Sequence, residues 1–93
     1  MRAREYYGLY RQRIEALAND AKAGEDWLEK LHGLLRQFEI EAAGLQPRSA
    51  ALLRSELCAQ LEHNALLAAG ARREVFFAAV KCLELQAPES EGS

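Results

Sequence analysis

The residues best suited to chemistry are a glutamate and a histidine three positions apart. Glu29 and His32 have the Glu-x-x-His spacing by which helical bundles direct two metal ligands to one helix face. A di-metal site needs a second such pair, whereas Glu62 and His63 are adjacent and diverge by about 100° on a helix. We therefore expect Glu29 and His32 to be solvated, with no metal and no cofactor, and a metalloenzyme is the minor alternative.

Other catalytic patterns are missing from the sequence. It contains no Gly-rich phosphate loop, no nucleophile elbow and no Cys/His pair at the spacing of a known catalytic family. Cys58 and Cys82 lie in Ala/Leu-rich surroundings without the close spacing of a metal or redox motif, and are expected to be free thiols. The sequence thus indicates a protein that is not an enzyme.

Composition predicts an all-α protein. The 93 residues include 17 Ala and 15 Leu, which favour helices, but only 2 Val, 2 Ile and no Thr, which favour sheets. A net charge of −2 argues against nucleic acid as the partner, because domains that bind phosphate backbones usually carry a basic excess. No apolar run approaches the roughly 18 residues of a membrane span, and the charged start lacks a signal-peptide pattern. We expect a cytoplasmic protein without membrane insertion.

Apolar residues at three-and-four spacing predict helices over residues 3–22 and 25–44. Gly24 suits the turn between them, because glycine tolerates the left-handed backbone that ends many helices. Pro47 then marks the start of a third helix over residues 48–86. Residues 1–86 form one domain on this interpretation, and 87–93 form a polar flexible tail.

Gly70 decides between two architectures. The apolar stripe keeps its phase across this glycine, and one interior glycine costs a helix only about 1 kcal/mol. The favoured prediction is an antiparallel three-helix bundle with a long third helix, and the alternative is a four-helix bundle broken at Gly70. In the broken form Cys58 and Cys82 are each twelve residues from the turn and could face each other, so an intramolecular crosslink between them would refute the long helix.

A long third helix has a functional consequence. At 1.5 Å per residue it spans about 58 Å and overhangs partners of about 30 Å, which leaves apolar side chains in water. Soluble monomers rarely expose such a patch unless it binds a partner. Leu52, Leu66 and Phe77 also form a second apolar face, which either packs inside the domain or receives a partner or a second copy of the chain. The predicted contact residues are Leu66, Phe76, Phe77, Val80 and Leu83.

Two segments resemble a known family. The turn Ala21-Lys22-Ala23-Gly24-Glu25-Asp26-Trp27-Leu28 is similar to the Ala-x-x-Gly-(Glu/Asp)-Trp-Asp-x-Leu turn of FliT-type flagellar type III export chaperones. Residues 61–67 (Leu-Glu-His-Asn-Ala-Leu-Leu), followed by Arg72-Arg73-Glu74, resemble the same family's polar and Leu-Leu segment before a charged stretch.

The resemblance implies a cytoplasmic chaperone that binds the filament-cap protein before export. It also implies docking to the export ATPase and gate, or to a flagellar transcriptional regulator. Such a chaperone would shield the amphipathic terminus of its client by accepting the apolar face. Two alternatives use similar surfaces: a helical antiactivator that sequesters a transcription factor, and a chaperone subunit of a virulence type III secretion system.

Overall fold

Four helices make up the part of the chain that the structure describes. This computed structural model describes residues 3–22 and 26–86, and its helices are α1 (Ala3–Asp20), α2 (Trp27–Ala42), α3 (Pro47–Leu66) and α4 (Gly70–Gln86). These residues contain no strand, so the all-α prediction is confirmed for them. The first two helices lie within their predicted bounds. The predicted turn at Gly24 and the predicted tail, 87–93, lie outside the described residues.

The predicted continuous third helix is wrong. Helix α3 ends at Leu66, residues 67–69 connect, and α4 begins at Gly70, as in the four-helix alternative. Gly70 has a φ of 65°, a left-handed conformation that glycine adopts without the steric penalty of other residues. The chain therefore reverses at the one residue of this segment that lacks a side chain.

Burial explains why the chain breaks here. Folding back places Phe76 and Leu83 in the core with 0% exposure, whereas an overhanging helix would leave both in water. Burying one such side chain contributes roughly 1.5–3 kcal/mol. Interrupting a helix loses a few backbone hydrogen bonds, each with a net contribution of roughly 1 kcal/mol. The several apolar side chains of α4 together outweigh that loss.

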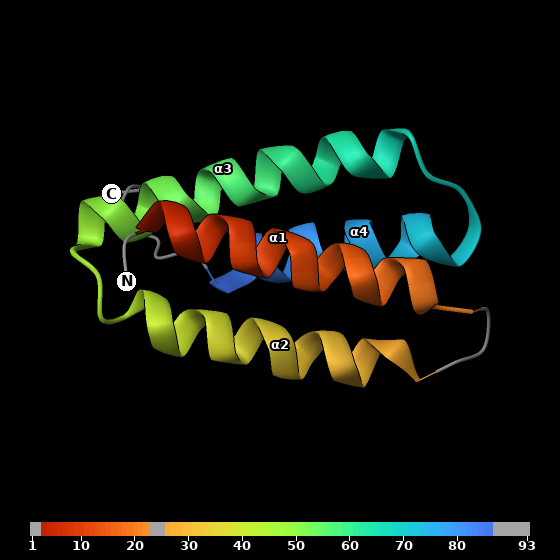
Figure 1. The fold of residues 1–93 in the computed structure, drawn as a ribbon, viewed down its shortest axis with the longest axis horizontal. Helices are drawn as coiled ribbons and strands as arrows, with labels where there is room; N and C mark the ends of the chain where they lie inside the picture. Colours follow the sequence, from red (N-terminus) through yellow and green to blue (C-terminus); the bar gives the residue numbers. More distant parts are fainter. Residues whose placement is uncertain (1–2, 23–25, 87–93) are drawn as a thin grey trace.

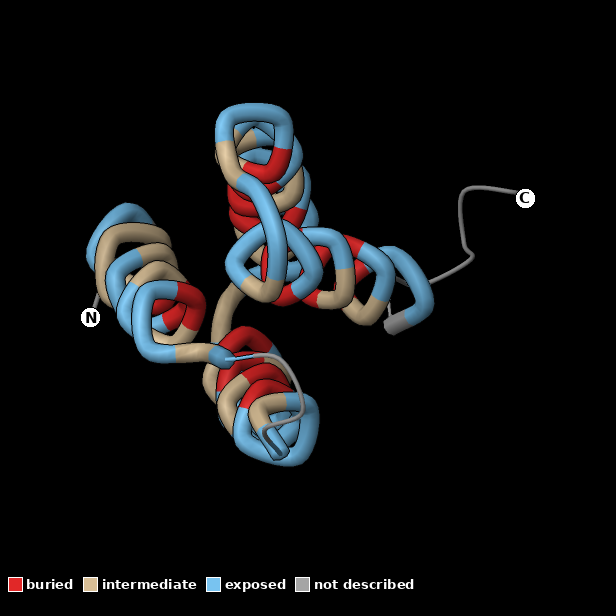
Figure 2. The backbone as a smooth tube through the Cα atoms, turned by 90° about the vertical axis from the view of Figure 1, so that its right-hand side faces the viewer, coloured by how far each residue is buried: buried red, intermediate tan, exposed pale blue. Residues whose placement is uncertain are grey.

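The helices run alternately up and down the bundle (Figure 1). Viewed along the bundle, their order around it is α1, α3, α4, α2 (Figure 2). Helices α1 and α4 pack against each other and against both other helices, whereas α2 and α3 occupy the far corners. The connection from α2 to α3 therefore crosses one end of the bundle, on the left in Figure 1.

The core lies between the apolar stripes of the four helices. In the middle of α1 and α2, the Tyr10 and Phe38 rings meet edge to face, 5.2 Å apart, a favoured arrangement of aromatic rings. None of the described helices is both long and apolar enough to cross a membrane. The buried apolar side chains are Tyr10, Ile14 and Ala18 of α1, Leu31, Leu35, Phe38 and Ala42 of α2, Leu53, Leu57, Leu61 and Ala65 of α3, and Val75, Phe76, Ala79, Val80 and Leu83 of α4.

Candidate functional site

The five predicted contact residues are divided between the surface and the core. Leu66 and Phe77 are exposed, by 73% and 43%. Phe76, Val80 and Leu83 are buried, so the prediction that they face a partner is wrong. Their exposure depended on an overhanging third helix, and the reversal at residues 67–69 turns them inward. Only Leu66 and Phe77 remain available to a partner.

A groove lies between α2 and α4 on the surface of the bundle. Its volume is about 560 Å³, within the range of roughly 300–1,000 Å³ typical of binding pockets. Leu85, on the α4 side, is 79% exposed, and Leu28, one turn before His32, is also exposed. The lining residues are His32, Leu35, Arg36 and Glu39 of α2 and Cys82 and Leu85 of α4.

Cys82 lies on a strip of small side chains along α4, and it and Leu85 line the α4 side of this groove. At 100° per residue, Ala71, Ala78 and Cys82 fall within about 40° of one another on the helix, and all three are partly exposed. The distance between packed helices depends on the side chains at the contact. At Cys82 a helix from a partner could approach α4 closely, with Leu85 and Leu35 beside it.

An ion pair involves Glu39, which lies at one end of the groove. The Arg54 guanidinium on α3 donates to both carboxylate oxygens of Glu39, with Nη2 at 2.6 Å and Nε at 3.3 Å. The Arg54 side chain is 10% exposed and that of Glu39 is 25% exposed. Glu39 also borders a second hollow, of about 390 Å³, beside the α2–α3 connection. The pair thus ties together the two helices at the far corners of the bundle.

The charge of the groove is set by this pairing. Because Arg54 neutralises Glu39, the remaining full charge on the α2 side is that of Arg36. Among residues 3–22 and 26–86, Arg36 has no carboxylate partner. The groove therefore combines an apolar interior with an unpaired cation on one edge, which suits a partner with an apolar face and an acidic residue.

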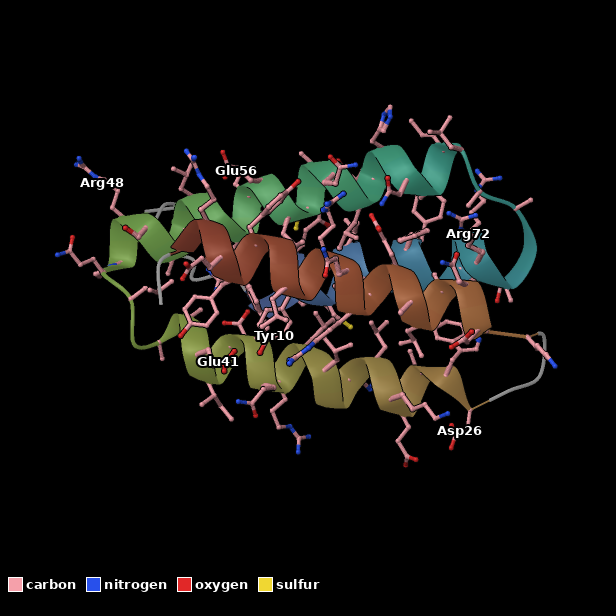
Figure 3. All side chains as sticks on the ribbon, viewed as in Figure 1. Tyr10, Asp26, Glu41, Arg48, Glu56 and Arg72 are labelled. Atoms are coloured by element: carbon pink, nitrogen blue, oxygen red, sulfur yellow. The ribbon has the colours of Figure 1, made fainter. Side chains whose placement is uncertain are left out.

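A partly buried polar contact holds α2 against α1. The Tyr10 hydroxyl donates a hydrogen bond to the Glu41 carboxylate, and the two side chains point toward each other in Figure 3. Burial and this hydrogen bond raise the pKa of Tyr10 to about 12. Since the neutral phenol is the donor, the contact is maintained throughout the physiological pH range. It fixes the position of the helix that supplies most of the groove.

The two thiols lie on different sides of α4. Cys82 lines the groove against α2, whereas Cys58 on α3 lies within electrostatic range of Glu84. Residues 82 and 84 point about 200° apart around a helix. Both cysteines are free thiols, as expected from the sequence. Burial, followed by the negative charges of Glu84 and Glu62, raises the pKa of the Cys58 thiol to about 11.

Metal-binding chemistry gains no support within the described ranges. Glu29 and His32 are both exposed, as the sequence predicted. Over residues 3–22 and 26–86, no three His, Cys, Asp or Glu side chains group in a way that could hold a metal ion. His32 instead contributes a polar edge to the groove between α2 and α4.

The groove was not predicted from the sequence, although one signal for it is present there. Leu85 lies outside the core stripe of α4, so a large apolar side chain was predictable on a solvent-facing side. The location of Arg36 and Cys82 beside it depends on which helices are neighbours, and this was not predictable from α4 alone.

Comparisons with known proteins supply no precedent for this arrangement. Neither a protein-family model, nor a curated protein, nor a solved structure matches the chain.

Proposed function

We propose that this protein is a small non-catalytic chaperone that binds an amphipathic client helix in the groove between α2 and α4. The groove itself carries the proposal. Its walls include the buried Leu35 of α2, and the exposed Leu85 and partly exposed Cys82 of α4. Helix-in-groove recognition uses such surfaces, with client side chains at positions i, i+3 or i+4, and i+7 as anchors.

The client helix places its apolar face against α4 and its polar face toward solvent. An acidic client residue on the α2 side pairs with Arg36, which has no other carboxylate partner among the described residues. Such an interface is partly exposed, so the charge contributes more to orientation and association rate than to affinity. Shielding the apolar face keeps a client from aggregating before it is delivered.

The client we propose is the filament-cap export substrate of a flagellar type III system, bound in the cytoplasm. The support for this choice is the resemblance of two segments, residues 21–28 and 61–74, to FliT-type chaperones. Docking of the loaded chaperone to the export ATPase and gate, or to a flagellar regulator, belongs to the same proposal. The described helices lack a metal cluster and a membrane span, which is compatible with a binding role.

Titration calorimetry of the purified protein with a filament-cap protein tests this function. The wild-type protein is expected to bind with a micromolar or lower dissociation constant. Leu85→Glu places a charge in the groove, and is expected to weaken binding at least about tenfold, since one apolar contact contributes more than 1.4 kcal/mol. Leu85 is 79% exposed, so the substitution leaves the core intact.

Ile40→Glu is the matched control. Ile40 is a 60% exposed apolar residue of α2 and is not part of the groove lining, so its substitution is expected to leave the affinity unchanged. Wild-type protein that fails to bind the cap protein would reject the chaperone proposal. Binding that is unchanged by Leu85→Glu but weakened by Phe77→Asp would instead assign the client to the sequence-predicted surface.

A further inference from the structure

An exposed leucine stripe runs along the outer side of α3, away from the groove. Leu52 and Leu66 are 59% and 73% exposed, and Ala59, midway between them, is also exposed. Seven residues turn a helix by about 700°, so the three lie within about 40° on one face. The stripe extends over about 21 Å of a helix about 30 Å long. Helix α3 is thus apolar on two sides and packs within the bundle on only one of them.

The stripe is symmetric about its centre. Leu52 precedes Ala59 by seven residues, and Leu66 follows it by seven. If a second α3 lies antiparallel across the first, with the two-fold axis at Ala59, each Leu52 meets the other copy's Leu66. The small central residue allows the helix axes to approach closely at the crossing point. A two-fold interface requires this kind of self-complementary surface.

The charges beside the stripe are complementary in the same arrangement. Glu56 and His63 lie on one edge of the stripe, and Figure 3 shows Glu56 on the outer side of α3. On this edge Glu56 and Ala59 border a hollow beside α1, whose Arg4 and Tyr7 line the other side. In the antiparallel pair, Glu56 of each copy lies within about 1.5 Å, along the axis, of the other copy's His63. Neither residue has an ion-pair partner among the described residues of its own chain. The opposite edge places Ser55 across from Glu62 in the same way.

Arg48 favours the antiparallel over the parallel orientation. It lies on the same face as the stripe, near the start of α3, and is exposed (Figure 3). A parallel pair would bring two copies of Arg48 together. The antiparallel pair instead keeps the two guanidinium groups apart, each level with residue 70 of the opposite chain, just beyond the end of its α3.

We propose that the outer face of α3, formed by Leu52, Ala59 and Leu66, binds a second copy of this chain as an antiparallel two-fold dimer. One helix pair is smaller than the roughly 800 Å² per partner of a standard interface, so the dimer is weak, with a dissociation constant of about 10–100 µM. The surface is separate from the client groove, so the dimer does not depend on the proposed function.

Sedimentation equilibrium of the full chain tests the dimer. The wild type is expected to convert from monomer to dimer as its concentration rises to about 500 µM, several times the expected dissociation constant. Leu52→Glu is expected to raise that constant at least about 100-fold, since each dimer loses two leucine contacts. Leu85→Glu, which changes an exposed leucine on another face, is expected to leave it unchanged. A wild type that stays monomeric throughout, or equal effects of both substitutions, would overturn the proposal.

Disulfide trapping tests the orientation, in a background in which Cys58 and Cys82 are both replaced by alanine. On oxidation, Ala59→Cys is expected to crosslink to its own copy. Leu52→Cys is expected to crosslink only when mixed with Leu66→Cys, because two copies of position 52 lie about 21 Å apart along the antiparallel pair. Crosslinking of Leu52→Cys to itself would show a parallel pair and overturn the inference.

Discussion

Separating the Arg54–Glu39 ion pair is expected to destabilise the bundle asymmetrically. Glu39→Met leaves the Arg54 guanidinium without an acceptor in a position where the side chain is only 10% exposed. Arg54→Met leaves a carboxylate that is 25% exposed and can be hydrated in part, while methionine retains most of the apolar stem of arginine. The glutamate substitution should therefore be the more damaging of the two.

The magnitudes follow from the burial of each partner. Removing one member of a buried ion pair costs about 3–5 kcal/mol, and the exposure of Glu39 places this pair at the lower end. We expect Glu39→Met to cost about 3 kcal/mol and Arg54→Met about 1–2 kcal/mol. Replacing both residues by methionine is expected to restore most of the stability, because two apolar side chains require no compensation for lost hydration.

Urea unfolding followed by far-UV circular dichroism measures all three variants and gives the coupling energy of the pair. The exposed pair between Arg11 and Glu15 is the internal control, with side chains 36% and 31% exposed and an N to O distance of 3.6 Å. Its coupling energy is expected to be about 0.5 kcal/mol or less. Equal, small effects of the two single substitutions at Arg54 and Glu39 would refute the argument from burial.

Three further expectations concern the turn, the thiols and the buried tyrosine. Gly70→Ala is expected to lower the free energy of unfolding by about 1 kcal/mol, because Gly70 has a positive φ. Gly33→Ala within α2 should raise the free energy of unfolding by about 0.5–1 kcal/mol, because an added Cβ meets nothing within 4 Å. Equal effects of the two substitutions in urea titrations would contradict this. Under mild oxidation the monomer should form no internal disulfide. A thiol reagent should modify Cys82 before Cys58, because the raised pKa of Cys58 reduces its thiolate fraction. Peptide mapping reports the order of modification, and the reverse order would be inconsistent with the burial of Cys58. The pKa of Tyr10 is raised from 10.0 to about 12, so the stabilisation by the neutral Tyr10 side chain is complete below pH 10 and is lost as the pH rises toward 12. In the Tyr10→Phe variant, the free energy of unfolding should no longer fall over this pH range. An unchanged dependence of stability on pH would exclude Tyr10 as the source of the fall.

The helical class and the first two helices were predictable because their signals are local. In α2, Leu31, Leu35 and Phe38 recur at three-and-four spacing, and all three are buried as that spacing predicts. Such a stripe depends only on which residues follow one another in the chain. The burial of Leu57 and Leu61 along the predicted stripe of α3 has the same origin.

The break between α3 and α4 was not predictable by the same reasoning. The apolar residues keep the same helical phase from Leu57 to Val75, which predicts a continuous helix. The apolar stripes before and after Gly70 nevertheless face the same core when the chain reverses between them. Phase alone therefore cannot distinguish a long helix from a hairpin whose turn keeps the register. Burial decides, because only the hairpin removes Phe76 and Leu83 from water. The same omission placed three core residues, Phe76, Val80 and Leu83, in the predicted contact surface and left the groove unrecognised.

The two proposed surfaces can be used at the same time because they face different directions. Viewed along the bundle, α3 forms one far corner, whereas the groove lies between α4 and the opposite corner, α2 (Figure 2). A two-fold pair through α3 therefore leaves a groove open on each copy, and the dimer would hold two client helices. Since none of the groove-lining residues belongs to α3, Leu52→Glu should abolish the dimer without altering the affinity of each groove for a client. If Leu52→Glu weakened both dimer formation and client binding, the two surfaces would be coupled through the bundle. The simplest link between them is Arg54, which lies on α3 and pairs with Glu39 at the end of the groove.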